Sequence, residues 1–285
     1  MTDIQISAES GDAAAIAESV RFAGRRRRYQ TTVRLAQALI VLFVLLLWQF
    51  GGGILFDAFY LGSPRGIGLI LLNDLQDPLF YRDIRVTGTE MALGYGLGAS
   101  LGIAFGGIFA RWRFVADVFD PFFVAFNSIP RIALAPLLVI WFGIDTGAKV
   151  VLAATLVFFV TFFSTLAGIR NVDSALINVA RVLGVNEWQL FFKVQLPASL
   201  SWIINGLRLS LPFALIGVIV GEFLVASSGL GYRLNMYSTT YNTNGTFAMI
   251  IVMMVFMMCL NGAVSFLERK AIGRAPAEDQ SYLHA

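Results

Sequence analysis

The amino-acid sequence predicts an all-α membrane protein with about six transmembrane helices. Of its 285 residues, 57 % are hydrophobic and only 14 % are charged, and the mean hydropathy is +0.73. Soluble domains carry about 25 % charged residues, so the composition argues against an ordinary soluble enzyme. Several charge-free stretches also reach the ~20 residues that a helix needs to cross a bilayer.

Six segments are predicted to span the membrane. Four are uninterrupted apolar runs, at residues 35–56, 91–110, 150–169 and 247–267. Residues 114–142 contain Pro121, Pro130 and Pro136, so we expect one broken span there. Residues 202–225 are apolar except for Arg208 and Glu222 near their ends.

The distribution of lysine and arginine predicts the orientation. With the N-terminus inside, 14 of the 21 basic residues fall in cytoplasmic segments and 5 in outer ones. The chain then divides into a cytoplasmic tail (1–32), a membrane domain (33–269) and a second cytoplasmic tail (270–285). The basic run at 25–28 could instead bind lipid or nucleic acid, but setting topology is the interpretation we favour, and we expect no nucleic-acid partner.

The segments expected outside the membrane differ in character. Residues 57–89 form the largest outer segment, and 67–75 are apolar enough to lie along the interface as an amphipathic helix. Residues 235–246 are polar and are predicted to form an outer loop.

Small residues recur every fourth position in the second predicted span, as Gly94, Gly98, Gly102 and Gly106. Such a row lets neighbouring helices approach closely. Packing within the chain is the interpretation we favour, and a dimer contact or a substrate path is the alternative.

The cytoplasmic segment 171–197 predicts a helix–turn–helix. Asp173 is suited to cap the first helix and Gly184 to end it. Asn186 and Gln189 have the spacing of a capping box, and Pro197 is expected to interrupt the second helix. Apolar side chains on its surface predict a docking site for another protein, the alternative being a membrane-surface hairpin without a partner. They are Val182, Leu183, Val185, Trp188 and Leu190.

Polar residues inside the spans are candidates for the pathway or its gate. Asn127, Ser128 and Arg131 flank the break in the third span, where a cation and unwound backbone would attract an anionic solute. Alternatively, Arg131 snorkels or pairs with an acidic residue, namely Asp117, Asp120 or Glu222. Glu222 is expected to be a structural or gating pair partner rather than a proton relay.

The segment 171–197 resembles the EAA loop of ATP-binding-cassette importer permeases. That pattern is E-A-A, three residues, G, nine residues, I, one residue, then L-P. Here it reads Asn178-Val179-Ala180, Gly184, Val194 and Leu196-Pro197, with the spacing kept and three residue types changed. Further motifs resemble the nitrate, sulfonate, taurine and bicarbonate branch. They include Gly221-Glu222-Phe223 and Ser228-Gly229-Leu230-Gly231-Tyr232.

The resemblance implies a type I importer permease fold and a division of labour between chains. Two permease copies, expected to be a homodimer, would form the pathway for a small anionic solute in the bacterial inner membrane. Two separate ATPase subunits would bind ATP and Mg²⁺, and an extracytoplasmic binding protein would deliver the solute. The residues implied to contact the ATPase are Asn178, Ala180, Gly184, Asn186, Glu187, Trp188, Leu196 and Pro197.

The absence of certain motifs from the sequence agrees with this division of labour between chains. It has no G-x-x-x-x-G-K-[ST] phosphate loop, and we expect this chain to bind no cofactor. Its single cysteine and single histidine argue against a Cys/His metal site, and no catalytic cluster is visible, so we expect no enzyme. The alternative function is a secondary transporter of a small organic anion, in which Glu222 and Arg131 couple ions to the solute without ATP.

Overall fold

A computed structural model describes residue 29 and the ranges 31–51, 58–225 and 227–271, and helices dominate them. Five helices in this part of the chain are long and apolar enough to cross a membrane, and a bent helix pair makes a sixth span. The predicted all-α membrane fold with about six spans is confirmed. The chain divides into two compact units, Met1–Gly68 and Leu69–Ala285.

The first unit contains the first predicted span. Its helix, Thr31–Gly51, begins four residues before the predicted start, and residues 52–57 lie outside the described part. The short helix α2 (Ala58–Leu61) follows it in the chain. The indole N–H of Trp48 donates to the carbonyl of Leu61, the last residue of α2, at 3.2 Å. Most of the predicted tail 1–32, and residues 272–285 of the predicted tail 270–285, also lie outside the described residues.

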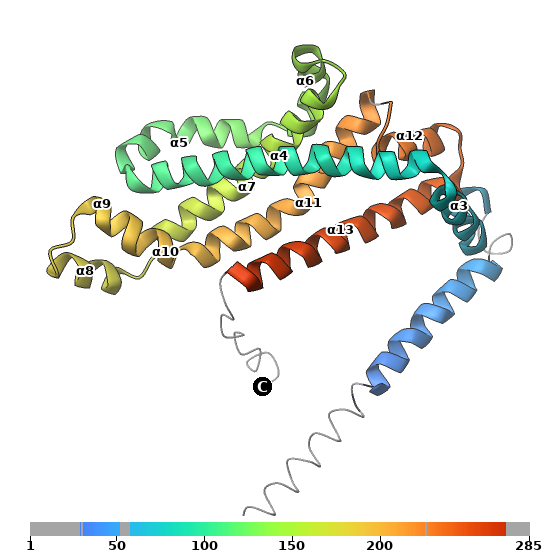
Figure 1. Ribbon diagram of the computed structural model, residues 1–285, viewed down its shortest axis with the longest axis horizontal. Helices are drawn as coiled ribbons and strands as arrows, with labels where there is room; N and C mark the ends of the chain where they lie inside the picture. The colour runs from blue at the N-terminus through green and yellow to red at the C-terminus, as the bar shows by residue number, and fades with distance from the viewer. Residues whose placement is uncertain (1–28, 30, 52–57, 226, 272–285) are drawn as a thin grey trace, which may run out of the picture. The chain divides into compact units, whose positions relative to one another are not determined.

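Three long helices build the core of the second unit. Helix α7 (Thr146–Arg170) packs against both α4 (Pro78–Arg111) and α11 (Leu200–Val225), as Figure 1 shows. Helix α13 (Thr243–Ala271) packs against this core through partly buried side chains. The buried apolar residues at the centre are Met91, Ala99, Ala153, Val157, Leu211, Ala214 and Val218.

The glycine row of α4 faces α7 within the chain. A Cβ atom added at Gly94 would lie 2.6 Å from the Cβ of Ala153, and one added at Gly106 would lie 2.8 Å from the carbonyl oxygen of Phe162. Gly98 and Gly102 approach α7 in the same way. The row therefore allows two helices to pack backbone against backbone.

Helix α4 is longer than the predicted second span, 34 residues instead of 20, and begins at Pro78 instead of residue 91. Asp77 caps it by accepting from the Leu79 N–H at 2.9 Å. The prediction started the span only after Glu90 because that residue is charged. In the structure Asp83 and Glu90 are buried with polar partners, so their charges do not end the helix.

The break predicted within residues 114–142 is present. Helix α5 (Arg113–Ser128) is followed by the 3₁₀ turn η1 (Arg131–Leu134) and by α6 (Ala135–Phe142), with a bend of 80°. Pro130 disfavours helical backbone at the residue before it, and Ile129 is extended, with φ −68° and ψ 128°.

The segments that were predicted to lie outside the membrane are more helical than expected. Helix α3 (Pro64–Gln76) and the first turns of α4 occupy most of 57–89. The loop predicted at 235–246 is wrong, because α12 (Leu230–Thr239) covers its first half and α13 begins at Thr243. Helix α12 forms because its buried side chains find partners on α3 and α4, which the polar sequence does not reveal.

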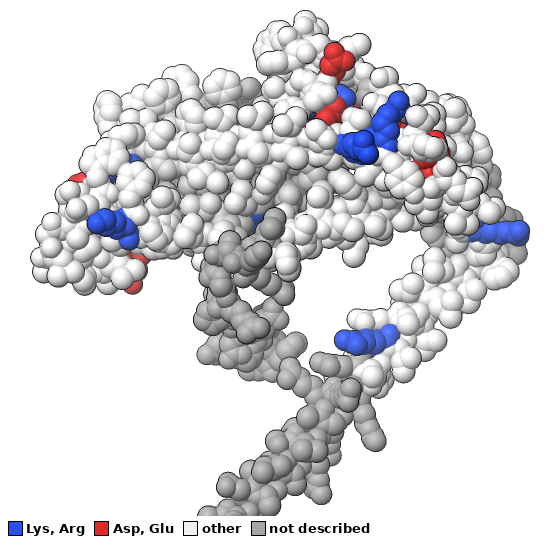
Figure 2. Space-filling model, in the orientation of Figure 1, with Lys and Arg blue, Asp and Glu red and all other residues white. Residues whose placement is uncertain are grey.

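Charged side chains of the second unit are unevenly distributed. On the face shown in Figure 2, one group lies around the first half of α4 and another at α8 and α9, with a broad uncharged surface between them. An apolar band between two charged ends is the pattern expected of a protein that crosses a bilayer.

Candidate functional site

The segment 171–197, called the coupling segment below, folds as the predicted helix–turn–helix. Helix α8 (Ser174–Val182) is capped by Asp173, which accepts from the Ala175 N–H at 2.8 Å. Gly184 makes the turn with φ +76°, a left-handed conformation that glycine adopts at little cost. Helix α9 (Glu187–Leu190) begins with a capping box in which Asn186 and Gln189 exchange hydrogen bonds of 2.8 and 3.2 Å.

The tip of the coupling segment exposes apolar side chains. Val182 is 88 % exposed and Leu183 77 % exposed, directly before the Gly184 turn. Leu190, which was expected on this surface, is instead buried at 2 % exposure. Asn178 and Asn186 are exposed, whereas Ala180 is buried.

Pro197 does not interrupt the second helix as predicted. A π-helical stretch, η2 (Phe191–Gln195), precedes it, and the chain continues through α10 (Leu196–Ala198) into α11. Proline has no N–H and clashes with the carbonyl four residues earlier in an α-helix. The wider π turn removes that conflict, so the coupling segment is joined to α11 by almost continuous helix.

Trp188 joins the coupling segment to the corner between α4 and α5. Its ring lies edge-on to Trp112, with centroids 6.0 Å apart, and the Arg111 guanidinium carbon is 5.4 Å from its centroid. The ring also stacks on Phe192. The sequence predicted an exposed aromatic side chain here, and the resemblance implied a contact with the ATPase, but not a contact with the α4–α5 corner.

At the bend between α5 and η1, Arg131 is held by its own neighbours. Its Nη2 donates to the carbonyl oxygen and to the side-chain oxygen of Asn127, and its guanidinium carbon lies 4.3 Å from the ring centroid of Phe159. Ser128 donates to the Val124 carbonyl at 2.8 Å. Among the described side chains, Arg131 forms none of the ion pairs that were the alternative for it.

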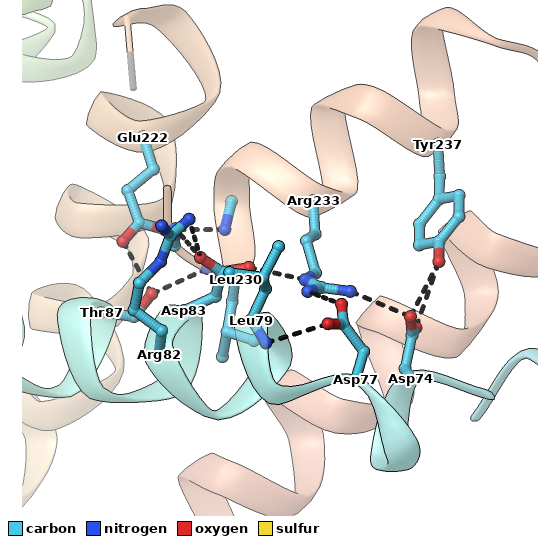
Figure 3. A network of polar contacts seen from close by, with 12 residues as sticks. Asp74, Asp77, Leu79, Arg82, Asp83, Thr87, Glu222, Leu230, Arg233 and Tyr237 are labelled. Atoms are coloured by element: carbon cyan, nitrogen blue, oxygen red, sulfur yellow. Dashed lines mark hydrogen bonds and ion pairs between the residues drawn. The ribbon is translucent and has the colours of Figure 1, made fainter. Parts of the chain in front are cut away.

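Glu222 lies in a different place, at the end of α11 close to α12 (Figure 3). Its side chain accepts from the Thr87 hydroxyl and from the Gly231 N–H, both at 2.7 Å, and is fully buried. The Leu230 N–H donates to Thr87 at 2.8 Å. The structure therefore brings Glu222 to the start of α12 and not to the Asn127–Arg131 bend.

Arg233 on α12 is surrounded by three aspartates (Figure 3). It donates to Asp83 at 2.6 Å, to Asp74 at 3.0 Å and to Asp77. Burial lowers the pKa of Arg233, but the hydrogen bonds to Asp77 and Asp83 outweigh it and raise the pKa overall. The hydrogen bond from Arg233 lowers the pKa of Asp77 in turn.

A buried ion pair lies deeper between α4 and α7. Lys149 Nζ is 2.5 Å from Glu90, and Thr146 donates to the same carboxylate oxygen at 3.2 Å. In the described part of the chain no cluster of three or more His, Cys, Asp or Glu side chains could hold a metal ion.

Comparison with known proteins identifies the family. The family model described as "binding-protein-dependent transport system inner membrane component" matches residues 98–273, which include the coupling segment, the bend and α12. This chain belongs to that family. The permease is therefore a transmembrane transport subunit of the ATP-binding-cassette importers.

Relatives and a solved structure agree with this assignment. The aliphatic sulfonates transport permease protein SsuC of Bacillus subtilis is 35 % identical over 258 residues, covering 90 % of this chain and 92 % of its own. The formylaminopyrimidine transport permease protein ThiX of Halalkalibacterium halodurans is 30 % identical, with 87 % and 95 % covered. A solved inward-facing structure of the MetNI methionine transporter matches with a TM-score of 0.60 and 19 % identity, covering 67 % of this chain and 95 % of that one. The fold is that of a type I importer permease.

Sequence reasoning missed most of the polar network around α12. It placed Asp74, Asp83 and Arg233 in outer segments without linking them. A signal was present, because Asp83, Thr87 and Glu90 are spaced i, i+4 and i+7, which is one face of a helix. That spacing indicates that the permease's second helix begins well before residue 91.

Proposed function

We propose that this permease is driven by a separate ATPase subunit that docks on the coupling segment. The exposed apolar pair Val182 and Leu183 carries this proposal. Exposed aliphatic side chains at a turn outside the apolar band have no membrane to cover them, so they fit a protein partner. The capped helices and the Gly184 turn hold the pair in a defined position before any partner binds.

Membership of the family supports a proposal for the rest of the assembly. Two permease copies would form the pathway in the bacterial inner membrane, with both termini and the coupling segment in the cytoplasm. Two ATPase subunits would bind ATP and Mg²⁺, and a binding protein would deliver the solute at the opposite face. The 14-to-5 distribution of basic residues supports this orientation.

For the solute we propose a small anion. Arg131 at the 80° bend is the cation that would attract it, beside the unwound backbone at Ile129 and Pro130. The name of the Bacillus relative, a sulfonate permease, supports an oxyanion, whereas the ThiX name shows that the family extends to other solutes.

Co-purification tests the docking proposal. The permease is expressed with its ATPase and purified in mild detergent, as wild type and as Val182→Glu/Leu183→Glu. The wild type is expected to retain the ATPase and the double variant to lose it, because two carboxylates would be desolvated on docking. Phe114→Glu is the matched control, since Phe114 is an equally exposed apolar residue on α5. Equal ATPase retention by the double variant would contradict the proposal.

Reconstitution distinguishes the proposed function from a secondary transporter. Liposomes that contain the permease alone are compared with liposomes that contain the complex and the binding protein, with ethanesulfonate and taurine as probes. We expect uptake only with ATPase and ATP present. Uptake of either probe by the permease alone, driven by an ion gradient, would instead support the secondary transporter.

A further inference from the structure

Trp188 occupies a position between the part of the permease proposed to bind the ATPase and the helices that lead to the bend. It belongs to α9, yet its described contacts extend to Arg111 and Trp112, far away in sequence. Val182 and Leu183 point to solvent at the tip of the same helix–turn–helix. The coupling segment therefore presents one apolar surface outward and one aromatic contact inward.

The corner that Trp188 contacts is short and well ordered by hydrogen bonds. Helix α4 ends at Arg111 and α5 begins at Arg113, so Trp112 is the single residue that links them. Its N–H donates to the Ile108 carbonyl at 3.0 Å, and its carbonyl accepts from the Ala116 N–H at 3.1 Å. A displacement of Trp112 must therefore move the ends of both helices.

The Arg111 side chain strengthens the contact. Its Nε is buried without a hydrogen-bond partner among the described residues, so the face of Trp188 provides electrostatic compensation for the guanidinium. Phe191, the third residue after Trp188, is buried and lies close to Gly107 in the last turns of α4. The α9–η2 region thus packs on α4 through two neighbouring aromatic residues.

Helix α5 connects this corner to the bend. Its 16 residues span about 24 Å at 1.5 Å per residue and end at Ser128, where Asn127 holds Arg131. Movement at its first turn reaches its last turn through Pro121, where one helical hydrogen bond is missing. Rotation or tilt at Trp112 would change the 80° bend and the position of Arg131.

We propose that Trp188 is a positioning residue that transmits movement of the coupling segment to the α4–α5 corner and, along α5, to the Arg131 bend. This inference rests on the proposed docking of the ATPase. It adds that α5 is moved by the contact of Trp188 with Trp112 and Arg111, and not only through the covalent connection of the coupling segment to α7 and α11.

An environment-sensitive fluorophore near the bend tests this inference. Phe126, an exposed residue of α5, is replaced by cysteine and labelled with bimane, after the exposed Cys259 is changed to serine. The full complex of permease and hydrolysis-deficient ATPase is studied in nanodiscs, with and without ATP. We expect ATP to change the bimane emission in the otherwise wild-type complex.

Substitutions at the contact are expected to reduce that change. Trp188→Leu and Trp112→Leu should each reduce the ATP-induced amplitude by about fivefold or more. Trp188→Tyr should restore most of it, because an aromatic face remains for Arg111. Phe192→Leu is the matched control, since it removes an aromatic neighbour of Trp188 and leaves the corner in place.

The outcomes separate the two proposals. Wild-type permease that never retains the ATPase contradicts the proposed function. An assembled wild-type complex without any ATP-induced change, or an unreduced change in Trp188→Leu, contradicts only the role of Trp188. If the Trp188→Leu variant no longer binds the ATPase, its bimane signal cannot test the role of Trp188. The Trp112→Leu variant then provides the test, because Trp112 lies outside the coupling segment. An unreduced amplitude in that variant overturns the inference.

Discussion

Arg233 and Asp83 lie 150 residues apart in the sequence and meet in the structure, where the guanidinium Nε donates to the carboxylate at 2.6 Å. Both side chains are buried, and the contact joins α12 to α4. With Asp74 it also joins α12 to the end of α3. The polar helix between the fifth and sixth spans is therefore attached to the bundle by charge and not by apolar packing alone.

Removing Arg233 should destabilise the permease strongly. Arg233→Met leaves three aspartates without their common partner, and the loss of one member of a buried ion pair costs about 3–5 kcal/mol. We expect a markedly lower thermal unfolding temperature in detergent. Arg82→Met is the control, because Arg82 is exposed and its 3.6 Å contact with Asp83 should contribute about 0–1 kcal/mol. Similar losses in the two variants would contradict a special role for the buried network.

Tyr237 should produce a stability change at alkaline pH. Burial, together with its hydrogen bond to Asp74, raises the pKa of Tyr237 to about 12, above the phenol value of about 10. Folding therefore favours the protonated phenol. Its contribution is complete below about pH 10 and is lost as the pH rises towards about 12. The stability difference between wild type and Tyr237→Phe should be constant up to about pH 10 and shrink above it, as measured by thermal unfolding across pH. A difference that stays constant up to pH 12 would count against this assignment.

Alanine substitutions at two glycines of α4 should have different effects on the stability of the permease. A Cβ atom at Gly102 would lie 2.6 Å from the Phe158 carbonyl oxygen, which belongs to helix backbone and cannot move freely. We expect Gly102→Ala to destabilise the permease by about 1–3 kcal/mol. Gly96 faces open space, so Gly96→Ala should be neutral or stabilise by up to about 1 kcal/mol through helix propensity. Unfolding temperatures of the two variants in the same detergent test this, and equal shifts would refute the packing role.

Gly184 allows a test of turn geometry without steric interference. Apart from Gly184 and its two chain neighbours, no described residue has an atom within 4 Å of the position where its Cβ would be, so a substitution acts mainly through the backbone at φ +76°. Gly184→Val should disfavour the turn by about 1–2 kcal/mol or more, whereas Gly184→Asn should be tolerated because asparagine adopts this conformation readily. We expect Gly184→Val to reduce ATPase binding by about tenfold or more and to uncouple ATP hydrolysis from transport. Titration of the ATPase onto each variant and ATP-driven uptake measure the two effects. Unchanged uptake in Gly184→Val would show that the turn does not transmit the movement.

Local patterns predicted much of the permease correctly. The 3.6-residue helix geometry brings Gly94, Gly98, Gly102 and Gly106 to one face, and the structure places that face on α7. Asp173, Gly184 and Asn186 lie where capping rules expect them, because caps depend on a few neighbouring residues. The bend after Ile129 follows from the steric demands of Pro130.

Predictions that treated charged or polar residues as boundaries failed at two places. The second span was expected to start only after Glu90, and 235–246 to be a loop, because charged and polar residues avoid an apolar environment when they are alone. In the structure Glu90 has Lys149 and Arg233 has Asp83, so both are compensated. The burial of Leu190 could not be predicted either, because it depends on what α9 packs against.

The sequence by itself determined the membrane class, the number of spans, the helix–turn–helix of the coupling segment and the resemblance to importer permeases. These properties rest on composition and on contacts within a few residues, which the order of residues specifies directly. Only the tertiary structure decided that Arg233 finds its aspartates, that Glu222 lies at α12 and not at Arg131, and that Trp188 reaches Trp112. Arg233 with Asp83 and Trp188 with Trp112 join elements distant in the chain, whereas Glu222 and Gly231 lie on consecutive helices. These contacts depend on how α4, α7 and α11 pack.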